Sequence, residues 1–409
     1  MADLTTSFLG LKSPNPFWLA SAPPTNCGSQ IQRAFEAGWG GAVWKTLGKP
    51  IQNVSSRLSA LDHGGNRMLG LNNIELITDR PLQENLDEME SVKKKYPRNI
   101  LVASLMVETR EEWKEIIRQV EGVGADAIEL NFGCPHGMCE RGMGSAVGQE
   151  PKLLKTITSW AKEFAKVPVI VKLTPNITDI TVPADAALQA GADAVSLINT
   201  IKSIISVDLD RFVPLPNVDG KSTNGGYCGP AVKPIALHMV AAIARKHREK
   251  LPISGIGGIS TWRDAAEFLA LGSTTVQVCT AVMHHGYRII EDLVQGLSDY
   301  LDAHRFQSVH DLVGKALPAF TDWGSLDLGF HQVARIHEAH CIGCNLCVVA
   351  CEDGAHQCIS LSSEFRPDGH TRKAPTVREE ECVGCNLCHL VCPSPGAITM
   401  DKVRPCTAG

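Results

Sequence analysis

The sequence first excludes several classes of protein by what it lacks. No apolar run approaches the roughly 20 residues that a membrane-spanning helix needs. The N-terminal stretch has no basic segment followed by an apolar one, so we expect no signal peptide. There is no long run of charge and the net charge is only −5, which gives no indication of nucleic acid or an anionic membrane as a partner. These absences predict a cytoplasmic globular protein.

A dinucleotide-binding loop is also missing. No G-x-G-x-x-G segment follows a first strand, so the sequence contains no visible Rossmann site. The 409 residues nevertheless suffice for one core of roughly 250–300 residues and a small second domain. Hydrophobic residues make up 44% of the chain and the mean hydropathy is close to zero, as in ordinary globular proteins.

Cysteine, in contrast, is abundant and regularly spaced. Eight of the 15 cysteines fall in two runs of the form C-x2-C-x2-C-x3-C, and the rest are scattered, which fits a reducing cytoplasm. This spacing is typical of proteins with two [4Fe–4S] clusters, where the fourth cysteine of each run ligates the other cluster. Structural zinc sites or ordinary buried cysteines are the weaker alternatives. The predicted ligand sets are Cys341, Cys344, Cys347 and Cys392 for one cluster, and Cys382, Cys385, Cys388 and Cys351 for the second.

The first three quarters of the chain alternate short apolar segments with amphipathic helical ones. Near-continuous apolar runs are typical of parallel strands buried on both faces. Eight such alternations predict an α/β fold, a (β/α)8 TIM barrel, with a doubly wound open sheet as the alternative. The predicted strands are Phe17–Ala20, Gly41–Lys45, Ile100–Leu105, Ala127–Asn131, Val169–Leu173, Ala194–Ile198, Ile253–Ile256 and Thr275–Cys279.

We expect three parts along the chain. The barrel spans 1–306, a linker or docking segment spans 307–335, and a ferredoxin-like domain with both cysteine runs spans 336–409. Between the two cysteine runs, the polar stretch Glu352–Glu381 is predicted to be a surface excursion.

The cofactor prediction starts from the glycine pair Gly257-Gly258 after the seventh strand. Loops at this place in a barrel commonly bind a phosphate with bare backbone N–H groups. Clusters transfer single electrons whereas organic redox chemistry usually transfers two, and a flavin can do both. Without a Rossmann loop, we infer FMN. Lys45 and Lys172, at the ends of two predicted strands, would supply positive charge to the reduced flavin or to its phosphate.

Two further segments predict a catalytic site at the C-terminal ends of the strands. The glycine-rich stretch NFGCPHGMCERGMG carries Cys134, a thiol that can give a proton and take it back. We interpret Cys139 in the same stretch as an ordinary small residue. The segment LNNIELI carries Asn73 and Glu75, which with Asn131, Asn199 and Thr200 suit a planar ring bearing N–H and C=O groups.

At these residues the chain resembles the dihydropyrimidine dehydrogenases, in the short bacterial form that is the FMN and iron–sulfur subunit of an NAD-dependent enzyme. The resemblance covers nearly the whole chain. It is carried by NPFWLASAPPT, LNNIELI, NFGCPHGMCERGMG, VKLTPN, INT, GGYCGPAVKPIAL, GIGGI and the two cysteine runs. The dihydroorotate dehydrogenases are broader relatives that share the barrel and the loop cysteine.

The resemblance implies a role for each matching residue. Cys134 is the general acid and base, and Asn73, Glu75, Asn131, Asn199 and Thr200 bind the pyrimidine. The implied FMN site consists of Ser21, Lys45, Lys172, Gly226, Gly257, Gly258 and Thr280. The implied reaction reduces the C5–C6 double bond of uracil or thymine, with hydride from N5 of FMN to C6 and a proton from Cys134 to C5. The implied partners are a second copy of the chain and a separate flavoprotein subunit that oxidises NADH and feeds electrons to the clusters.

One position departs from the family, and two other functions remain open. The family commonly has Ser before the loop cysteine, where this chain has Gly133, and a lost hydroxyl removes a hydrogen bond of about 0.5–1.5 kcal/mol.

A dihydroorotate-type dehydrogenase is the first alternative function, although Glu75 is expected to repel the carboxylate of orotate. The second is an electron-transfer module in which the barrel is only a docking surface, so that Cys134→Ala would have no effect.

Overall fold

The computed structural model describes residues 2–365 and 372–403. The chain forms two compact units, Met1–Phe320 and Thr321–Gly409. Within the described ranges, no helix is long and apolar enough to cross a membrane.

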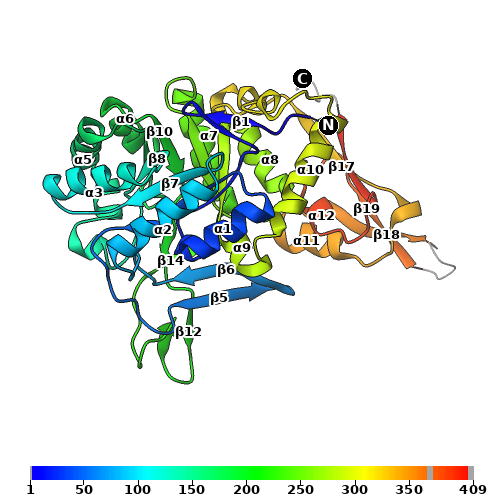
Figure 1. Ribbon diagram of the computed structural model, residues 1–409. Helices are drawn as coiled ribbons and strands as arrows, with labels where there is room; N and C mark the ends of the chain where they lie inside the picture. Colours follow the sequence, from blue (N-terminus) through cyan, green and yellow to red (C-terminus); the bar gives the residue numbers. More distant parts are fainter. Residues whose placement is uncertain (1, 366–371, 404–409) are drawn as a thin grey trace. The chain divides into compact units, whose positions relative to one another are not determined.

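The first unit is a closed barrel of eight parallel strands (Figure 1). Its strand order is β10-β15-β16-β3-β4-β7-β8-β9, and pairing of β9 with β10 closes it. The strands are β3 (Phe17–Leu19), β4 (Gly41–Leu47), β7 (Ile100–Leu105), β8 (Ala127–Asn131), β9 (Val169–Lys172), β10 (Ala194–Leu197), β15 (Ile253–Ile256) and β16 (Ser273–Val278). The eight predicted strands and the TIM barrel are therefore confirmed.

One helix follows each barrel strand and packs outside it. These helices are α1 (Gly28–Ala37), α2 (Leu82–Lys95), α3 (Arg110–Gly122), α5 (Pro151–Phe164), α6 (Thr181–Gln189), α7 (Lys233–His247), α8 (Trp262–Ala270) and α10 (Ile289–Ala303). Helix α3 illustrates why they form: Thr109 and Glu112 make a capping box at its start, and Trp113 and Ile117 belong to its buried face. The apolar face of each helix covers the strands, so the C-terminal strand ends are left to carry the site.

Two insertions build over the C-terminal end of the barrel. The chain after β4 forms β5 (Leu58–His63) and β6 (Asn66–Asn73), and the chain after β10 forms β11 (Ile201–Ser203) and β14 (Gly225–Cys228). Together they make a four-stranded antiparallel sheet in the order β11-β14-β6-β5. A hairpin of β12 (Ser206–Asp208) and β13 (Val213–Leu215) extends from it, and β1 (Thr6–Phe8) pairs with β2 (Leu11–Ser13) before the barrel begins. Short helices α4 (Ser145–Gly148) and α9 (Thr280–His285) follow β8 and β16.

The second unit is small and carries both cysteine runs. Strand β17 (His331–Ile336) pairs with β20 (Ile398–Val403), and β18 (Ile359–Phe365) pairs with β19 (Arg372–Val377). Helices α11 (Leu346–Gly354) and α12 (Leu387–Leu390) each begin within a cysteine run. Its core contains Val333, Ala334, Val348 and Ile398 together with five buried cysteines.

The structure differs from the sequence prediction at two segments. The stretch Glu352–Glu381 is not merely a surface excursion, because it contains the β18–β19 pair and buries Cys358 and Ile359 in the core of the second unit. The barrel unit also continues to Phe320, beyond the boundary expected at 306, because Val309 and Leu312 are buried in the barrel core. The three-part division remains a prediction.

Candidate active site

A cavity of about 730 Å³ opens at the C-terminal ends of the barrel strands. Such a volume is typical of cofactor and substrate sites. All but one of the residues predicted for catalysis, pyrimidine and FMN line it: Ser21, Lys45, Asn73, Glu75, Asn131, Cys134, Lys172, Asn199, Thr200, Gly257, Gly258 and Thr280. Residues separated by more than 250 positions in the chain are brought together because all eight parallel strands end on one face.

Gly226 is the predicted site residue that does not line the cavity. It lies in β14, paired with Asn73 of β6 and with Lys202 of β11. A Cβ at this position would lie 2.1 Å from Oγ1 of Thr200. Glycine is therefore required for the close approach of this backbone to Thr200. Gly226 thus affects the site by allowing the position of Thr200, and it does not line the cavity itself.

A chain of hydrogen bonds links residues at the ends of five strands on one wall of the cavity. Asn199 donates from Nδ2 to Oδ1 of Asn131 at 2.9 Å, and Asn131 donates from Nδ2 to Oγ1 of Thr46, also at 2.9 Å. Oγ1 of Thr46 lies 3.2 Å from Oγ of Ser21 and 2.9 Å from Oγ of Ser104. These bonds hold the amides of Asn131 and Asn199 in one orientation, so they present fixed donors and acceptors to a bound ring.

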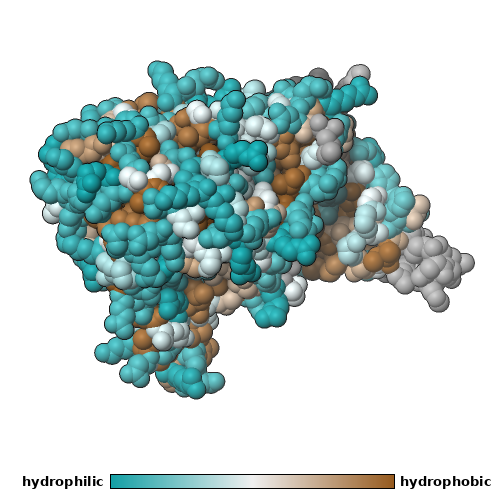
Figure 2. Space-filling model, viewed as in Figure 1, coloured by the Kyte–Doolittle hydropathy of each residue, from teal (hydrophilic) through white to brown (hydrophobic). Residues whose placement is uncertain are grey.

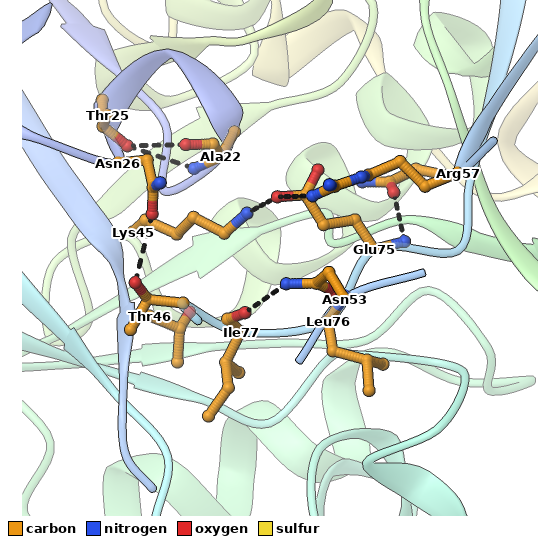
Figure 3. A network of polar contacts seen from close by, with 12 residues as sticks. Ala22, Thr25, Asn26, Lys45, Thr46, Asn53, Arg57, Glu75, Leu76 and Ile77 are labelled. Carbon is orange, nitrogen blue, oxygen red and sulfur yellow. Dashed lines mark hydrogen bonds and ion pairs between the residues drawn. The ribbon is translucent and has the colours of Figure 1, made fainter. Parts of the chain in front are cut away.

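Three charged side chains meet at the edge of the same site (Figure 3). Oε1 of Glu75 contacts Nζ of Lys45 and lies 3.6 Å from NH1 of Arg57. The Lys45 and Glu75 side chains are only 6% and 9% exposed. Burial lowers the pKa of Lys45 to about 8, which still leaves the ammonium charged at neutral pH. Glu75 is thus a paired carboxylate between two cations, and Arg57 is a site residue that the sequence prediction missed.

The β4–β5 connection holds this charged group in place. Asn53 accepts a hydrogen bond from the backbone N–H of Leu76 at 2.6 Å and donates to the carbonyl of Ile77 at 3.1 Å (Figure 3). The N–H of Ile74 donates to the carbonyl of Arg57 at 3.0 Å. Arg57 and Glu75 are therefore neighbours through backbone pairing as well as through charge.

Cys134 lies on the loop after β8 and lines the cavity as a half-buried thiol. Desolvation raises its pKa to about 11, so the thiol is protonated at neutral pH. The Sγ of Cys134 donates a hydrogen bond to the carbonyl oxygen of His136, at a distance of 3.4 Å. This state suits a proton donor.

His136, two residues further along, was not predicted from the sequence. Burial lowers its pKa to about 4, so the ring is neutral. Its Nε2 lies 3.2 Å from the carbonyl oxygen of Glu75, which requires the N–H on Nε2. Its buried Nδ1 has no hydrogen-bond partner within the described chain and is left as a bare acceptor. The ring therefore ties the Cys134 loop to the Glu75 segment.

Gly133 is explained by the packing of Asn199. A Cβ at position 133 would lie 2.3 Å from Cβ and 2.4 Å from Nδ2 of Asn199. The Cβ of Asn199 cannot rotate away, because it is bonded to the backbone. The space that a serine side chain needs is therefore already occupied by Asn199.

We predict that Gly133→Ser weakens pyrimidine binding by about 5-fold or more. Overpacking a tight site costs about 1–3 kcal/mol, and here it displaces the amide of Asn199, which lines the cavity. Titration of the flavin absorbance with uracil measures the dissociation constant. Gly122→Ser is the control, because a Cβ there meets nothing within 4 Å. An unchanged or tighter constant for Gly133→Ser would contradict the predicted clash.

A buried polar group lies beneath the cavity around Lys172. The fully buried Glu129 accepts from Oγ of Ser196 at 2.7 Å and from Nε2 of Gln277 at 3.3 Å. Its other oxygen has no hydrogen-bond partner among the described residues and lies 3.7 Å from Nζ of Lys172. Glu129 keeps the charge of Lys172 balanced without a short contact, so the ammonium stays available to a ligand in the cavity.

The seventh strand ends in a turn that fits the phosphate of a flavin. Gly257 and Gly258 have φ of +131° and +76°, a region that favours glycine. A Cβ on Gly258 would lie 2.9 Å from the carbonyl oxygen of Gly229 and from Cβ of Lys233. Only bare backbone fits here. With the two lysines, this turn gives the cavity the donors that a flavin phosphate and isoalloxazine ring need.

In the second unit the cysteines line two separate cavities. Cys341, Cys344, Cys347 and Cys392 line one, and Cys351, Cys382, Cys385 and Cys388 line the other together with Cys358. Each cavity therefore takes three cysteines from one run and the fourth from the other, in the crossed pattern expected from the spacing. Over the described ranges no group of three His, Cys, Asp or Glu side chains is arranged to hold a single metal ion. Four thiols around a cavity form the donor set of an iron–sulfur cluster.

A barrel with a cavity for a flavin, joined to a unit with two cysteine-lined cavities, defines a redox enzyme. Comparison with known proteins agrees. The dihydroorotate dehydrogenase family matches residues 3–301, and the 4Fe-4S dicluster domain matches residues 334–400.

Three relatives define the family more closely. The NAD-dependent dihydropyrimidine dehydrogenase subunit PreA of Escherichia coli (strain K12) is 44% identical over 367 residues, 89% of each chain. The chloroplastic dihydropyrimidine dehydrogenase (NADP(+)) of Arabidopsis thaliana is 46% identical over 78% of each chain. The catalytic subunit of dihydroorotate dehydrogenase B (NAD(+)) of Thermococcus kodakarensis is 38% identical over 78% of this chain and 99% of its own.

The chain belongs to the dihydropyrimidine dehydrogenases, within the wider dihydroorotate dehydrogenase family, and is an oxidoreductase with a flavin domain and an iron–sulfur domain.

Proposed function

We propose that the chain catalyses the reversible, NAD-dependent reduction of the C5–C6 double bond of uracil or thymine. The observation that carries this proposal is that the thiol of Cys134 lines a cavity that also presents the amides of Asn131 and Asn199 and the carboxylate of Glu75. A pyrimidine ring has both N–H and C=O groups on its edge, so it needs donors and acceptors of this kind. The names of the two dihydropyrimidine dehydrogenase relatives support the same substrate class.

The ring is held by side chains from different strands. We infer that Asn73, Glu75, Asn131, Asn199 and Thr200 bind it, because all of them line the cavity. The hydrogen bonds from Thr46 through Asn131 to Asn199 fix the amides before the substrate enters, which lowers the entropy lost on binding.

FMN is the proposed flavin, held by Ser21, Lys45, Lys172, Gly257, Gly258 and Thr280, with Gly226 behind them. When bound, it supplies hydride chemistry at C6 of the ring. Cys134 donates its proton to C5 in the direction of reduction, and its thiolate accepts that proton in the reverse direction. Burial raises the pKa of Cys134 from its ordinary value to about 11, so the thiol stays protonated at neutral and mildly alkaline pH.

The two directions should respond differently to pH. Because burial raises the pKa of Cys134 to about 11, the donor remains protonated until the pH approaches that value. We therefore expect kcat/KM for uracil reduction to show no loss from this group at neutral or mildly alkaline pH. Oxidation of dihydrouracil needs the thiolate and should rise with pH over the same range. Initial rates in both directions, from neutral pH upward, test this. Lys45 has a pKa of about 8 and can itself cause a fall with that midpoint. A fall in the reduction rate near pH 8 that disappears in Cys134→Ser would contradict the protonated thiol.

We further propose two [4Fe–4S] clusters, ligated by the two crossed cysteine sets. They would relay electrons to FMN from an NADH-oxidising partner subunit with its own FAD. The absence of a Rossmann loop in this sequence and the word subunit in the name of the Escherichia coli relative support such a partner. A cytoplasmic location also remains a proposal.

A second copy of the chain is the other proposed partner. The β12–β13 hairpin and the two residues before it expose four apolar side chains: Ile204 at 55%, Val207 at 46%, Leu209 at 74% and Phe212 at 82%. Brown side chains gather on this part of the surface in Figure 2. A cluster of large exposed apolar residues is typical of an interface, and the homodimer implied by the family would cover it.

A dihydroorotate-type dehydrogenase is the second candidate, because Glu75 is paired. Its contact with Lys45 and Arg57 offsets part of the charge that is expected to repel the carboxylate of orotate. The relative from Thermococcus kodakarensis favours the same comparison.

The decisive experiment compares substrates in one half-reaction. The purified chain is reduced chemically without oxygen, and the flavin absorbance is followed after uracil, thymine or orotate is added. We expect rapid flavin oxidation by uracil or thymine and slow oxidation by orotate. Efficient oxidation by orotate alone would favour the second candidate. No oxidation by any of them, with FMN and iron present, would favour an electron-transfer module.

A further inference from the structure

Five cysteine side chains, and not four, line the second cysteine cavity. The fifth is Cys358, whose Sγ lies 3.5 Å from Sγ of Cys351. It is buried, with 3% of its surface exposed, and it belongs to neither C-x2-C-x2-C-x3-C run. Two sulfurs at this distance face the same corner of the cavity, so either could reach an iron atom there.

Backbone hydrogen bonds on both sides of Cys358 hold it against Cys351. The N–H of Gln357 donates to the carbonyl of Cys351 at 3.0 Å, and the N–H of Arg378 donates to the carbonyl of Cys358 at 2.8 Å. Gln357 itself has φ of +59°, a conformation uncommon for a residue with a side chain. Strand β18 begins immediately afterwards at Ile359. The thiol is thus placed by the fold of the insertion.

The first cysteine cavity provides an internal comparison. Each cysteine run is followed by a strand, which begins at Ile359 after the first run and at Ile398 after the second. The residue before the strand is Cys358 in one case and Ala397 in the other. Ala397 lines the first cavity, as Cys358 lines the second. Each cavity is therefore lined by the residue that precedes a strand, and this residue carries a methyl group in the first cavity and a thiol in the second.

We propose that Cys358 is an alternative ligand for the iron atom that Cys351 ligates in the second cluster. In the exchange, the Fe–S bond to Cys351 breaks and one to Cys358 forms. The proton of the Cys358 thiol passes to the Cys351 thiolate, and no electron is transferred. Among the described residues that line the first cavity, there is no such reserve for Cys392. This inference rests on the proposed presence of two clusters.

The test compares loss of the fourth ligand in the two sites. Full-length variants are purified without oxygen, and iron, sulfide and FMN per chain are measured together with the electron paramagnetic resonance spectrum. We expect Cys351→Ala to keep the iron content of the wild type and Cys358→Ala to keep it too. Cys351→Ala/Cys358→Ala should lose iron and give the spectrum of a three-iron cluster. Cys392→Ala should do so by itself, and Cys392→Ala/Ala397→Cys should regain the lost iron.

Two results would overturn the inference. One is that Cys351→Ala loses as much iron as the double variant, and the other is that the added cysteine at position 397 restores nothing. Should Cys351→Ala fail to fold, Cys351→Ser with and without Cys358→Ala gives the same comparison. Wild-type chain with FMN but without the iron of two clusters would instead refute the cluster proposal. FMN bound by the barrel reports on that unit independently.

Discussion

Replacing Cys134 with Ala is expected to slow the oxidation of the reduced flavin by uracil by ~10²–10⁴-fold, the usual contribution of a positioned general acid. The loss arises because Cys134 is the thiol of the loop after β8 that lines the cavity, and its raised pKa of about 11 keeps it protonated. Rapid mixing of chemically reduced protein with uracil measures the rate. The dissociation constant of uracil should change little, because the substitution removes a proton donor and leaves the ring-binding amides in place.

Cys139→Ala is the matched control. It lies on the same glycine-rich loop, is also half-buried, and is not part of the cavity lining. Its rate should stay within a factor of about two of the wild type, since no proton passes through it. Equal rates for the wild type and Cys134→Ala would mean that another group or water protonates C5, and the proposed role of Cys134 would then be wrong.

Glu75→Gln is expected to lower the stability of the barrel unit by about 3 kcal/mol. Removing one member of a buried ion pair leaves the other charge without a partner, at a cost of about 3–5 kcal/mol. Lys45 is 6% exposed and would face Arg57 without the carboxylate between them. Arg57 is 37% exposed, so solvent screens its interaction with Lys45 and Glu75. The lower end of the range therefore applies. Thermal unfolding of FMN-free chain, followed by tryptophan fluorescence, measures the change.

The exposed pair of Arg110 and Glu163 supplies the control for this prediction. Its side chains are 43% and 55% exposed, and Glu163→Gln should change the free energy of unfolding by less than about 1 kcal/mol. Equal effects of Glu75→Gln and Glu163→Gln would mean that the Lys45–Glu75 pair does not stabilise the fold. Glu75→Gln should also weaken uracil binding, because Glu75 is one of the proposed ring ligands.

The barrel strands could be predicted because they are local. Each is a short, nearly continuous apolar run, and Ile100–Leu105, Ala127–Asn131 and Ile253–Ile256 have the bounds expected from the sequence. The same holds for the capping box of Thr109 and Glu112, which depends only on residues three apart. The apolar pattern of the strands and the spacing of the capping residues are therefore enough to predict these elements.

Glu129 is the buried residue that the sequence could have revealed. It is an acidic side chain in the middle of the apolar strand Ala127–Asn131, and such a charge is costly unless it is paired. That signal predicts a partner inside the barrel. It does not identify Lys172, Ser196 or Gln277, which come from three other strands.

Other features of the site left no signal in the sequence. Arg57 is an ordinary basic residue in a polar stretch, and only the pairing of β5 with β6 brings it to Glu75. The sequence indicated that Gly133 replaces a serine and so removes a hydroxyl. The packing of Asn199 shows that the site has no room for that side chain. In the sequence, Cys358 is one of the scattered cysteines outside the two runs. Only the fold of the insertion places it against Cys351.

The sequence by itself determined the fold class, and it predicted the cysteine sets and the residue types of the site, because these depend on short-range periodicity and spacing. The tertiary structure decided which of those residues meet. It placed Arg57 against Glu75, filled the space beside Gly133 with Asn199, and added a fifth thiol to the second cysteine cavity. The physical reason is that contacts between residues far apart in the chain depend on packing in three dimensions, which leaves no period in the sequence.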